Sequence, residues 1–385
     1  MGITLYRSPD LLMMGEGSIA NIGKEAKKYD ANHVLVVADA FLVENKIINH
    51  VFDYLTNENI TYDINQSIIP EPPFELLERI GSEIREKNYD LIIGIGGGSV
   101  LDSAKILSIL AKYELDLRSV VGTNLVPEKG LPFFLTPTTS GTGSEVTWNA
   151  IFTDEKDHVK KGIVSPYLLP QLSIVDPELT YTMPPSVTAA TGMDALVHAI
   201  ESYTSLRTDE LNKAIALQAI KLINKSLRKA VHNGKDRVAR ADMSNGSLLA
   251  GISLANAGVG AVHALAYPLG GKFKVPHGVS NSVLLPYVME YNVISDLDAF
   301  VEIAEALELQ TDNLSKREIA DEFVSYLKQF VKDIGIPTSM SVFGVTKEDV
   351  PKMAEEASKI ERLLSNNPRK LSVNDIEQIY YNALG

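Results

Sequence analysis

Asp194 and His198 are the residues whose types and spacing point most directly to chemistry. They lie four positions apart in the segment Gly192–Glu201, which has no helix-breaking residue after its first glycine. Residues four apart on a helix share one face, with Cβ atoms about 5–6 Å apart. Two side chains placed in this way can bind the same metal ion.

Two further histidines, His263 and His277, stand in apolar segments punctuated by glycine. One carboxylate and three imidazoles form a ligand set that suits Fe(II), Zn(II) or a neighbouring divalent ion. Each histidine taken alone is better explained as a hydrogen-bonded core residue or a helix cap than as a metal ligand. Because three of only seven histidines occur in such segments, the set as a whole favours a metal site.

The composition limits the class of protein. With 385 residues, the chain exceeds one ordinary hydrophobic core, so two domains are expected. A net charge of −13 argues against nucleic acid or an anionic membrane as a partner. The absence of cysteine excludes disulfides and thiolate sites and fits a reducing compartment. No signal-like apolar core and no run of about 18 apolar residues is present, so we expect a cytoplasmic protein.

The first half alternates between apolar strands and helices. Strands are predicted at 34–38, 61–64, 91–95 and 133–136, with helices at 43–57, 74–87 and 100–113. This alternation indicates a parallel sheet covered on both faces. Shorter strands at 151–153, 162–164 and 172–175 predict a hairpin that closes the sheet.

The pattern changes after Pro184-Pro185. No convincing strand follows, and helical periodicity predicts helices at 209–232, 237–255, 279–291, 296–307, 316–334, 346–361 and 373–383. We therefore predict an α/β domain over residues 1–184 and an all-helical, metal-binding domain over residues 185–385.

Two loops in the first half have the composition of anion-binding sites. The segment Gly94–Ser99 follows a strand and opens a helix, where glycines admit a phosphate and the helix N-terminus offers N–H groups. It departs from the usual dinucleotide fingerprint, because Ser99 replaces the third glycine, and a tight turn alone would also require glycine. The loop 136–144, rich in hydroxyls, predicts a second anion cradle or a ribose contact; a polar surface loop is the alternative.

Asp39 ends the first strand of the α/β half. A carboxylate there can bind ribose hydroxyls and repel a 2′-phosphate. In an ordinary dinucleotide fold the acid follows the glycines by about 20 residues, whereas here it precedes them, so the strand order must differ. The alternative interpretation is a cap for the next helix.

These motifs together resemble a known family. The glycine loop with Asp102 and Lys105, the block 137–147, Met183-Pro-Pro, Ala190–Glu201 and Pro276-His-Gly278 are similar to those of the iron-dependent, or group III, alcohol dehydrogenases. The likeness runs in order from about residue 10 to the last predicted helix. It implies an N-terminal Rossmann-like domain, an all-helical C-terminal domain and an NAD(P) cleft between them.

The resemblance also implies the site residues. It assigns the metal, Fe(II) or Zn(II) in its place, to Asp194, His198, His263 and His277. It assigns the cofactor to Asp39, Gly97, Gly98, Ser99, Asp102, Thr138, Thr139, Thr142, Thr147, Lys160 and Leu179. With Asp39 in that position, we expect NAD rather than NADP.

Two positions depart from the family pattern. Many members carry a histidine four residues after the third metal ligand, where this chain has Tyr267. Helical spacing from His263 puts Tyr267 on the metal-facing side, which makes it a candidate catalytic residue. The only tryptophan, Trp148, stands where it narrows the substrate pocket. A bulky pocket wall is the alternative for both residues.

The predicted reaction is the reversible conversion of a primary alcohol or diol into its aldehyde or ketone. A divalent ion lowers the pKa of the alcohol, and hydride passes to the nicotinamide. The alternatives are a glycerol dehydrogenase-like, maleylacetate reductase-like or dehydroquinate synthase-like enzyme, or a metal- or nucleotide-binding module without turnover. We expect a small alcohol or aldehyde as substrate and a homodimer or larger homo-oligomer.

Overall fold

The structure is a computed structural model that describes residues 4–154, 156 and 159–385. The chain divides into two compact units. Residues 7–182 form the first, which we call the α/β unit. Residues 183–385 form the second, the helical unit, together with residues 4–6.

The α/β unit is built on a six-stranded parallel sheet of strand order β1-β9-β6-β4-β2-β3. Its strands are β1 (Leu11–Met14), β2 (His33–Ala38), β3 (Thr61–Asn65), β4 (Leu91–Gly96), β6 (Phe133–Pro137) and β9 (Leu172–Val175). Its α-helices are α1 (Ile22–Lys27), α2 (Ala40–Glu44), α3 (Asn49–Asn57), α4 (Phe74–Arg85) and α5 (Gly98–Leu110). Short 3-10 helices are η1 (Ser18–Asn21), η2 (Leu117–Val120), η3 (Ser144–Val146), η4 (Pro166–Leu168) and η5 (Pro177–Thr180).

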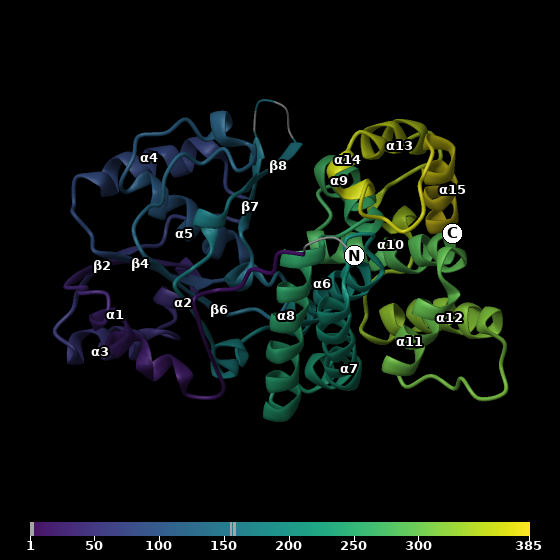
Figure 1. The fold of residues 1–385 in the computed structure, drawn as a ribbon, viewed down its shortest axis with the longest axis horizontal. Helices are drawn as coiled ribbons and strands as arrows, with labels where there is room; N and C mark the ends of the chain where they lie inside the picture. Colours follow the sequence, from purple (N-terminus) through teal and green to yellow (C-terminus); the bar gives the residue numbers. More distant parts are fainter. Residues whose placement is uncertain (1–3, 155, 157–158) are drawn as a thin grey trace. The chain divides into compact units, whose positions relative to one another are not determined.

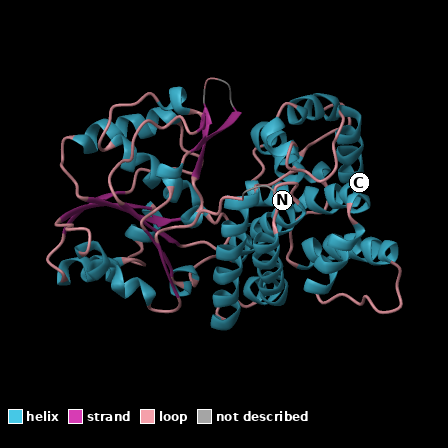
Figure 2. Ribbon diagram, in the orientation of Figure 1, coloured by secondary structure: helices cyan, strands magenta, loops and turns pink. Residues whose placement is uncertain are grey.

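Helices cover both faces of this sheet. Leu35 and Val37 of β2 belong to a core shared with α4 and α5, whereas Val34 and Val36 belong to a second core shared with α1 and α3. Figure 1 shows α4 and α5 on one side of the sheet and α1 and α3 on the other, and Figure 2 shows the strands between these layers. Burial on both faces explains why the strands are almost continuously apolar. The predicted fold class is confirmed.

The strand order explains why Asp39 precedes the glycine loop in the sequence. β2 pairs directly with β4, and Ala38 is the partner of Ile95, so Asp39 follows β2 beside Gly96. The chain passes from β2 to β3 on one side and from β4 to β6 on the other. Ligands of open α/β sheets bind at such a reversal, outside the carboxyl ends of the strands.

The structure corrects two details of the predicted α/β half. The hairpin of β7 (Asn149–Asp154) and β8 (Val159–Val164) forms, but it belongs to a separate three-stranded sheet with β5 (Gly122–Thr123). It does not close the main sheet, because the fully buried β9 takes the place beside β6. The single helix predicted at 43–57 is divided into α2 and α3, since Lys46 between them adopts a left-handed backbone (φ 58°).

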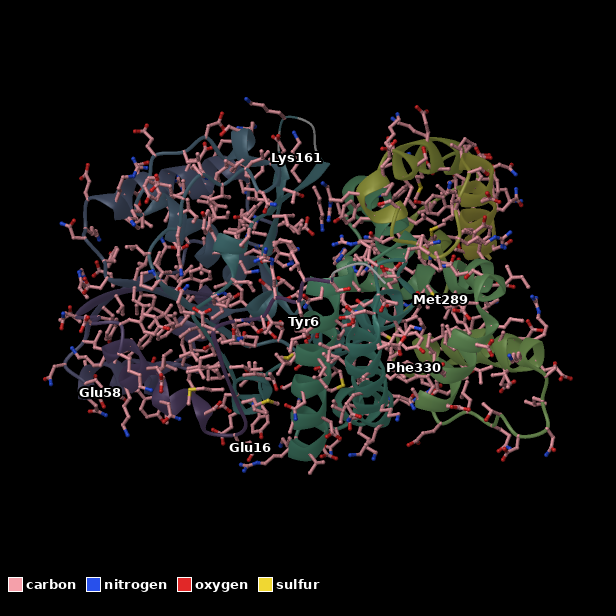
Figure 3. The ribbon with its side chains drawn as sticks, viewed as in Figure 1. Tyr6, Glu16, Glu58, Lys161, Met289 and Phe330 are labelled. Atoms are coloured by element: carbon pink, nitrogen blue, oxygen red, sulfur yellow. The ribbon has the colours of Figure 1, made fainter. Side chains whose placement is uncertain are left out.

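The helical unit contains only helices among residues 183–385. They are α6 (Pro185–Thr204), α7 (Glu210–His232), α8 (Arg237–Ala257), α9 (Ala261–Phe273), α10 (His277–Asn292), η6 (Val293–Ser295), α11 (Leu297–Ala306), α12 (Lys316–Asp333), η7 (Met340–Phe343), α13 (Val350–Ser358), α14 (Glu361–Leu364) and α15 (Val373–Leu384). Met289 of α10 and Phe330 of α12 are fully buried in one apolar core (Figure 3). The helix predicted at 346–361 is shorter in the structure, where α13 covers only Val350–Ser358 and α14 begins at Glu361.

In the part of the chain that the structure describes, no single helix is both long and apolar enough to cross a membrane. Only when α8 and α9 are taken together are their length and composition sufficient for a membrane span, and these two helices are bent by 104° at the break between them.

Candidate functional site

Helix α6 carries the first two predicted metal ligands into the interior of the helical unit. Asp194 and His198 are buried. Gly192 lets the neighbouring helices approach closely, because a Cβ added there would lie 2.3 Å from Leu227 Cδ1 and 2.9 Å from Met243 Cε.

Helices α9 and α10 supply the other two histidines. His263 lies in the first turn of α9, and His277 is the first residue of α10, directly after Pro276. Gly278 allows α10 to touch α6, since a Cβ at this position would lie 2.2 Å from the carbonyl oxygen of Ala190. The glycine therefore has a packing reason to stand beside the ligand.

The three imidazoles converge on one carboxylate oxygen. The Nε2 atoms of His198, His263 and His277 lie 3.9, 3.9 and 3.8 Å from Asp194 Oδ1. These separations are too long for hydrogen bonds, but ligand atoms held about 2.0–2.2 Å from one ion are spaced at about 3–4 Å. Ligand atoms of Asp194, His263 and His277 all lie within 4.8 Å of one another.

His198 completes the predicted set from the side of α6. Its ring stacks on that of His263, with centroids 4.8 Å apart and planes inclined by 16°. The helical spacing that suggested a joint role for Asp194 and His198 is therefore realised, and packing adds His263 and His277 from two other helices.

The chemistry of this donor set fits a divalent cation. Burial alone would raise the pKa of Asp194, but the nearby His198, His277 and His263 reverse this effect, and the net direction is downward. A carboxylate kept charged among imidazole nitrogens is a cation-binding arrangement. Asn281 Nδ2 points at the same atoms, 2.7 Å from Asp194 Oδ1 and 3.2 Å from His263 Nε2.

Sequence reasoning gave Glu201 no role, yet its carboxylate holds the third ligand. Glu201 is buried on α6, where Oε2 lies 2.6 Å from His263 Nδ1 and Oε1 accepts from the backbone N–H of Val262 at 2.6 Å. With Nδ1 donating its proton to the carboxylate, the lone pair of Nε2 faces the metal position. No local pattern in the sequence indicates this role, because Glu201 and His263 are 62 positions apart.

Tyr267 lies one turn along α9 from His263, on the side that the sequence predicted. Its ring centroid is 6.3 Å from that of His277, and the side chain is partly buried against the helical core. It is thus a neighbour of the ligand cluster on the side of His277.

The glycine loop of the α/β unit has the features of an anion cradle. α5 begins at Gly98 without a side-chain cap and without an acidic residue in its first turn, so its N-terminal dipole is not neutralised locally. A Cβ at Gly98 would lie 2.7 Å from Thr142, and one at Gly97 would lie 3.5 Å from Thr139. The two predicted loops are therefore packed against each other.

Three further predicted cofactor residues, Asp39, Thr138 and Leu179, also belong to the α/β unit. Asp39 directly follows Ala38, the partner of Ile95 in β4, and it also caps α2, because Phe41 N–H donates to its Oδ1 at 2.8 Å. Both interpretations of Asp39 are compatible, since the cap uses one carboxylate oxygen. Thr138 donates its backbone N–H to Gly96 O at 3.0 Å, and Leu179 is buried in η5.

Glu71, which sequence reasoning did not single out, joins two predicted cofactor residues. Its backbone N–H donates to Ser99 Oγ at 3.1 Å, and its carboxylate lies 2.7 Å from Lys160 Nζ. Glu71 adopts a left-handed backbone, with a φ of 52°. No spacing rule connects a glutamate between prolines with a lysine on β8.

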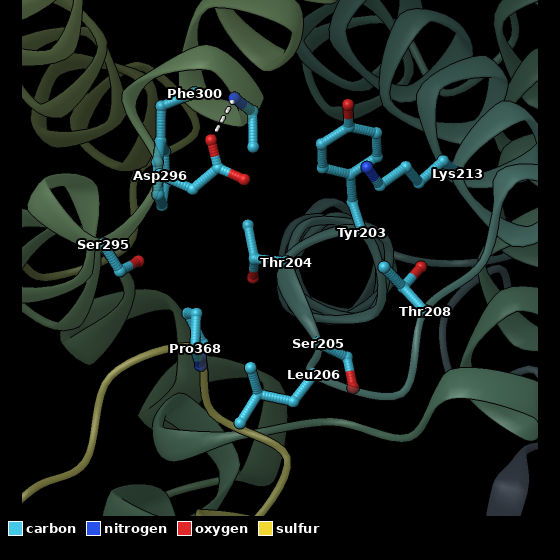
Figure 4. Close-up of a pocket in the computed structure, with 11 residues that line it drawn as sticks. Tyr203, Thr204, Ser205, Leu206, Thr208, Lys213, Ser295, Asp296, Phe300 and Pro368 are labelled. Carbon is cyan, nitrogen blue, oxygen red and sulfur yellow. Dashed lines mark hydrogen bonds between the residues drawn. The ribbon is translucent and has the colours of Figure 1, made fainter. Parts of the chain in front are cut away.

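A pocket of about 200 Å³ lies at the C-terminal end of α6. Two of its polar side chains already serve the fold: Tyr203 Oη donates to Glu302, and Asp296 caps α11 by accepting from Ala299 N–H (Figure 4). None of the predicted metal or cofactor residues lines it. We therefore assign it no part in the reaction.

Comparison with known families identifies the chain. Residues 9–177 match the profile of iron-containing alcohol dehydrogenases, and residues 188–384 match the C-terminal profile of the Fe-containing alcohol dehydrogenase family. The chain belongs to the iron-containing alcohol dehydrogenase family. The family predicted from the motifs is confirmed.

Individual members of this family match over nearly the whole chain. A long-chain-alcohol dehydrogenase of Geobacillus thermodenitrificans is 43% identical over 99% of this chain and 96% of its own. An NAD-dependent methanol dehydrogenase of Bacillus methanolicus is 35% identical over 99% and 100%. A crystal structure of a 1,3-propanediol oxidoreductase superposes with a TM-score of 0.96 at 36% identity, covering 100% of both chains.

These matches agree with the predicted enzyme class and cofactors. The chain is an alcohol dehydrogenase of the NAD- and metal-dependent kind, and its candidate metal centre contains Asp194, His263 and His277.

Proposed function

We propose that this iron-containing alcohol dehydrogenase interconverts a primary alcohol or diol with its carbonyl product. Asp194, His198, His263 and His277 hold one divalent ion, and the loops after β2, β4 and β6 bind NAD. The observation that carries the proposal is the convergence of three imidazole Nε2 atoms, each 3.8 or 3.9 Å from Asp194 Oδ1.

When bound, the divalent ion supplies a Lewis acid that lowers the pKa of the alcohol hydroxyl, and NAD accepts the hydride. The protein residues orient these groups. Glu201 fixes the ring of His263 through Nδ1, and burial of Asp194 limits the access of water to its carboxylate. Tyr267 shapes the substrate side of the cluster and donates one hydrogen bond, which leaves the alcohol proton to a cofactor ribose or to water.

The cofactor residues in this proposal are those of the two loops and their neighbours. Gly97, Gly98 and Ser99 receive the pyrophosphate at the start of α5. Asp39 binds ribose hydroxyls and disfavours the 2′-phosphate of NADP, because two negative charges in a partly buried site repel each other. The remaining contacts come from Asp102, Thr138, Thr139, Thr142, Thr147, Lys160 and Leu179.

The proposed substrate class, a primary alcohol or diol, is supported by the named relatives, and its size is attributed to two residues that differ from the family pattern. Relatives named for long-chain alcohols, methanol and 1,3-propanediol share the scaffold, so the scaffold alone does not select the alcohol. The assembled ligand set disfavours a metal-free, maleylacetate reductase-like reaction. Trp148 and Tyr267 are the bulky residues through which this chain would select the size of its substrate.

Self-association is part of the proposal. β1 is an edge strand of the main sheet, with Leu11 43% exposed and Met14 50% exposed. An edge strand with unpaired backbone groups and apolar side chains favours pairing with another chain, which supports a homodimer or larger assembly. We place the enzyme in the cytoplasm, where a chain without cysteine is at no disadvantage.

The test is a turnover screen with reconstituted protein. The chain is stripped of metal, reloaded separately with Fe(II), Zn(II) and Ni(II), and assayed with short and long primary alcohols, diols and aldehydes using NAD(H) and NADP(H). We expect metal-dependent turnover with NAD and a primary alcohol or diol. Binding of metal and NADH without turnover of any substrate would contradict the proposal and favour a binding module.

A further inference from the structure

One face of α5 is fastened to the segment that follows the second loop. Gly98, Asp102 and Lys105 are spaced at helical intervals of four and three, so they share that face. Gly98 packs against Thr142, and the carboxylate of Asp102 accepts from Ser144 Oγ at 2.5 Å. Lys105 makes the last contact of the series.

Lys105 is entirely buried, with 0% exposure. Its Nζ donates to Asp102 Oδ1 at 3.2 Å, to Thr147 Oγ1 at 3.0 Å and to the carbonyl oxygen of Asn149 at 2.7 Å. An ammonium group has three N–H donors, so every donor has a partner within the protein. Burial lowers the pKa of Lys105, while the charge of Asp102 opposes that shift. A buried ammonium is tolerated only when it is paired in this way.

Asp102 ties the same region together from the other side. Its second oxygen accepts from the backbone N–H of Ile151 at 2.9 Å. Ile151 belongs to β7, as does Asn149. The lysine and the aspartate therefore connect the helix that follows the glycine loop with both the second loop and the first residues of β7.

We propose that Lys105 is a positioning residue of the dinucleotide site, which holds the Asp102 carboxylate and the Thr147 hydroxyl in place before NAD arrives. Lys105 acts through these two residues, because its own donors are fully used. The inference rests on the proposed function, since Asp102 and Thr147 are cofactor residues only if the α/β unit binds NAD. A preformed site lowers the ordering cost of binding.

The chain carries its own reporter for this segment. Trp148 is the only tryptophan and lies between Thr147 and Asn149, the two residues that Lys105 contacts outside α5. Its fluorescence in cofactor-free protein reports whether the segment keeps its position. The same fluorophore reports NADH binding by energy transfer.

The experiment compares Lys105→Met with wild type and with Ile109→Ala. Methionine keeps an unbranched, apolar chain but donates no hydrogen bond. Ile109 is a buried residue of the same helix outside the contact series, so its variant reports destabilisation alone. We expect Lys105→Met to raise the NADH dissociation constant about tenfold or more and to shift Trp148 emission without cofactor. Ile109→Ala should lower Tm but keep emission and NADH affinity within about twofold.

Lys105→Met with wild-type NADH affinity, or with losses no larger than those of Ile109→Ala, would overturn the proposal. If Lys105→Met does not fold, Thr147→Val and Thr147→Ser replace it. The valine variant removes the acceptor and should change cofactor-free Trp148 emission, whereas the serine variant should not. Unchanged emission in Thr147→Val would overturn the proposal. If the wild-type protein binds no NADH, the proposed function itself is refuted, and the contacts of Lys105 have only a structural role.

Discussion

The two candidate sites handle a buried carboxylate in opposite ways. In the helical unit, Asp194 is 3% exposed and three imidazoles hold its pKa below the usual range. In the α/β unit, Glu145 is 2% exposed, and burial raises its pKa to about 7 although Lys105 opposes that shift. The first site keeps a negative charge where a cation is needed. The second combines the acidic Asp39 and Asp102 with the buried Lys105, and it offers backbone N–H groups and hydroxyls.

This contrast extends to the way each site is assembled. The metal ligands come from α6, α9 and α10, so helix packing must succeed before the cluster exists. The dinucleotide loops follow adjacent parallel strands, and the sheet register alone brings them together. We therefore expect the metal site to respond sharply to single substitutions and the dinucleotide site to respond in smaller steps.

The largest effect is expected for His263→Ala. Loss of one ligand should lower turnover by about a thousandfold or more, because the Lewis acid contributes several kcal/mol, while NADH still binds. Metal content and kcat/KM are the measurements. His232→Ala is the matched control, since this exposed histidine of the same unit contacts the Asp333 carbonyl and is not one of the proposed ligands. Normal metal content and rate in His263→Ala would be incompatible with the site.

Glu201→Gln tests the residue behind the ligand. The amide keeps the size of the side chain but removes the charge that orients His263, so metal affinity should fall about 10–100-fold. Competition with a chelator measures this without turnover. Glu302→Gln serves as the control, because that carboxylate bonds to Tyr203 rather than to a ligand. Equal metal affinity in both variants would mean that Glu201 only supports the backbone of α9.

Asp39→Asn separates charge from capping in the α/β unit. Asparagine caps a helix as well as aspartate does, so α2 should stay intact while the preference for NAD over NADP narrows about tenfold. The ratio of kcat/KM for the two cofactors is the measurement. Asp39→Gly should narrow the preference equally but also lose the bond to Phe41. An unchanged ratio in both variants would leave Asp39 as a helix cap alone.

The smallest effect is expected for Tyr267→Phe. If the ring mainly shapes the pocket, removing its hydroxyl should lower kcat/KM by about tenfold or less. Tyr267→Ala should open the pocket to bulkier alcohols, which a substrate series would detect. A loss of about a thousandfold or more in the phenylalanine variant, at unchanged metal content, would instead make the phenol an essential proton carrier.

Local patterns accounted for most of the fold. Periodicity predicted β2, β4, α4, α7, α8 and α12 because each is a single run with one apolar pattern. It missed β1, since four exposed or half-exposed residues have no distinctive pattern. It also misassigned the hairpin, because the choice of partner strand depends on contacts that no short segment encodes.

The candidate sites show the same difference between local patterns, which could be predicted, and contacts between distant residues, which could not. The spacing of Asp194 and His198 and the glycine loop could be predicted because each is a short, continuous stretch of the sequence. Glu201 could not, since its bond to His263 joins residues 62 positions apart. Glu71 and Lys160 are separated by 89 positions. Such pairs appear only when the chain has folded, and their residue types alone suggest ordinary surface charges.

The central claim is that one divalent ion in the helical unit is needed for turnover but not for cofactor binding. The most direct measurement titrates metal-free protein with Fe(II) under anaerobic conditions and follows NADH formation from a primary alcohol, together with the NADH dissociation constant at each step. We predict that the rate rises linearly and becomes constant at a single equivalent per chain, while NADH affinity stays the same. Full turnover in the metal-free protein, or a rate that follows NADH affinity rather than bound metal, would contradict the account.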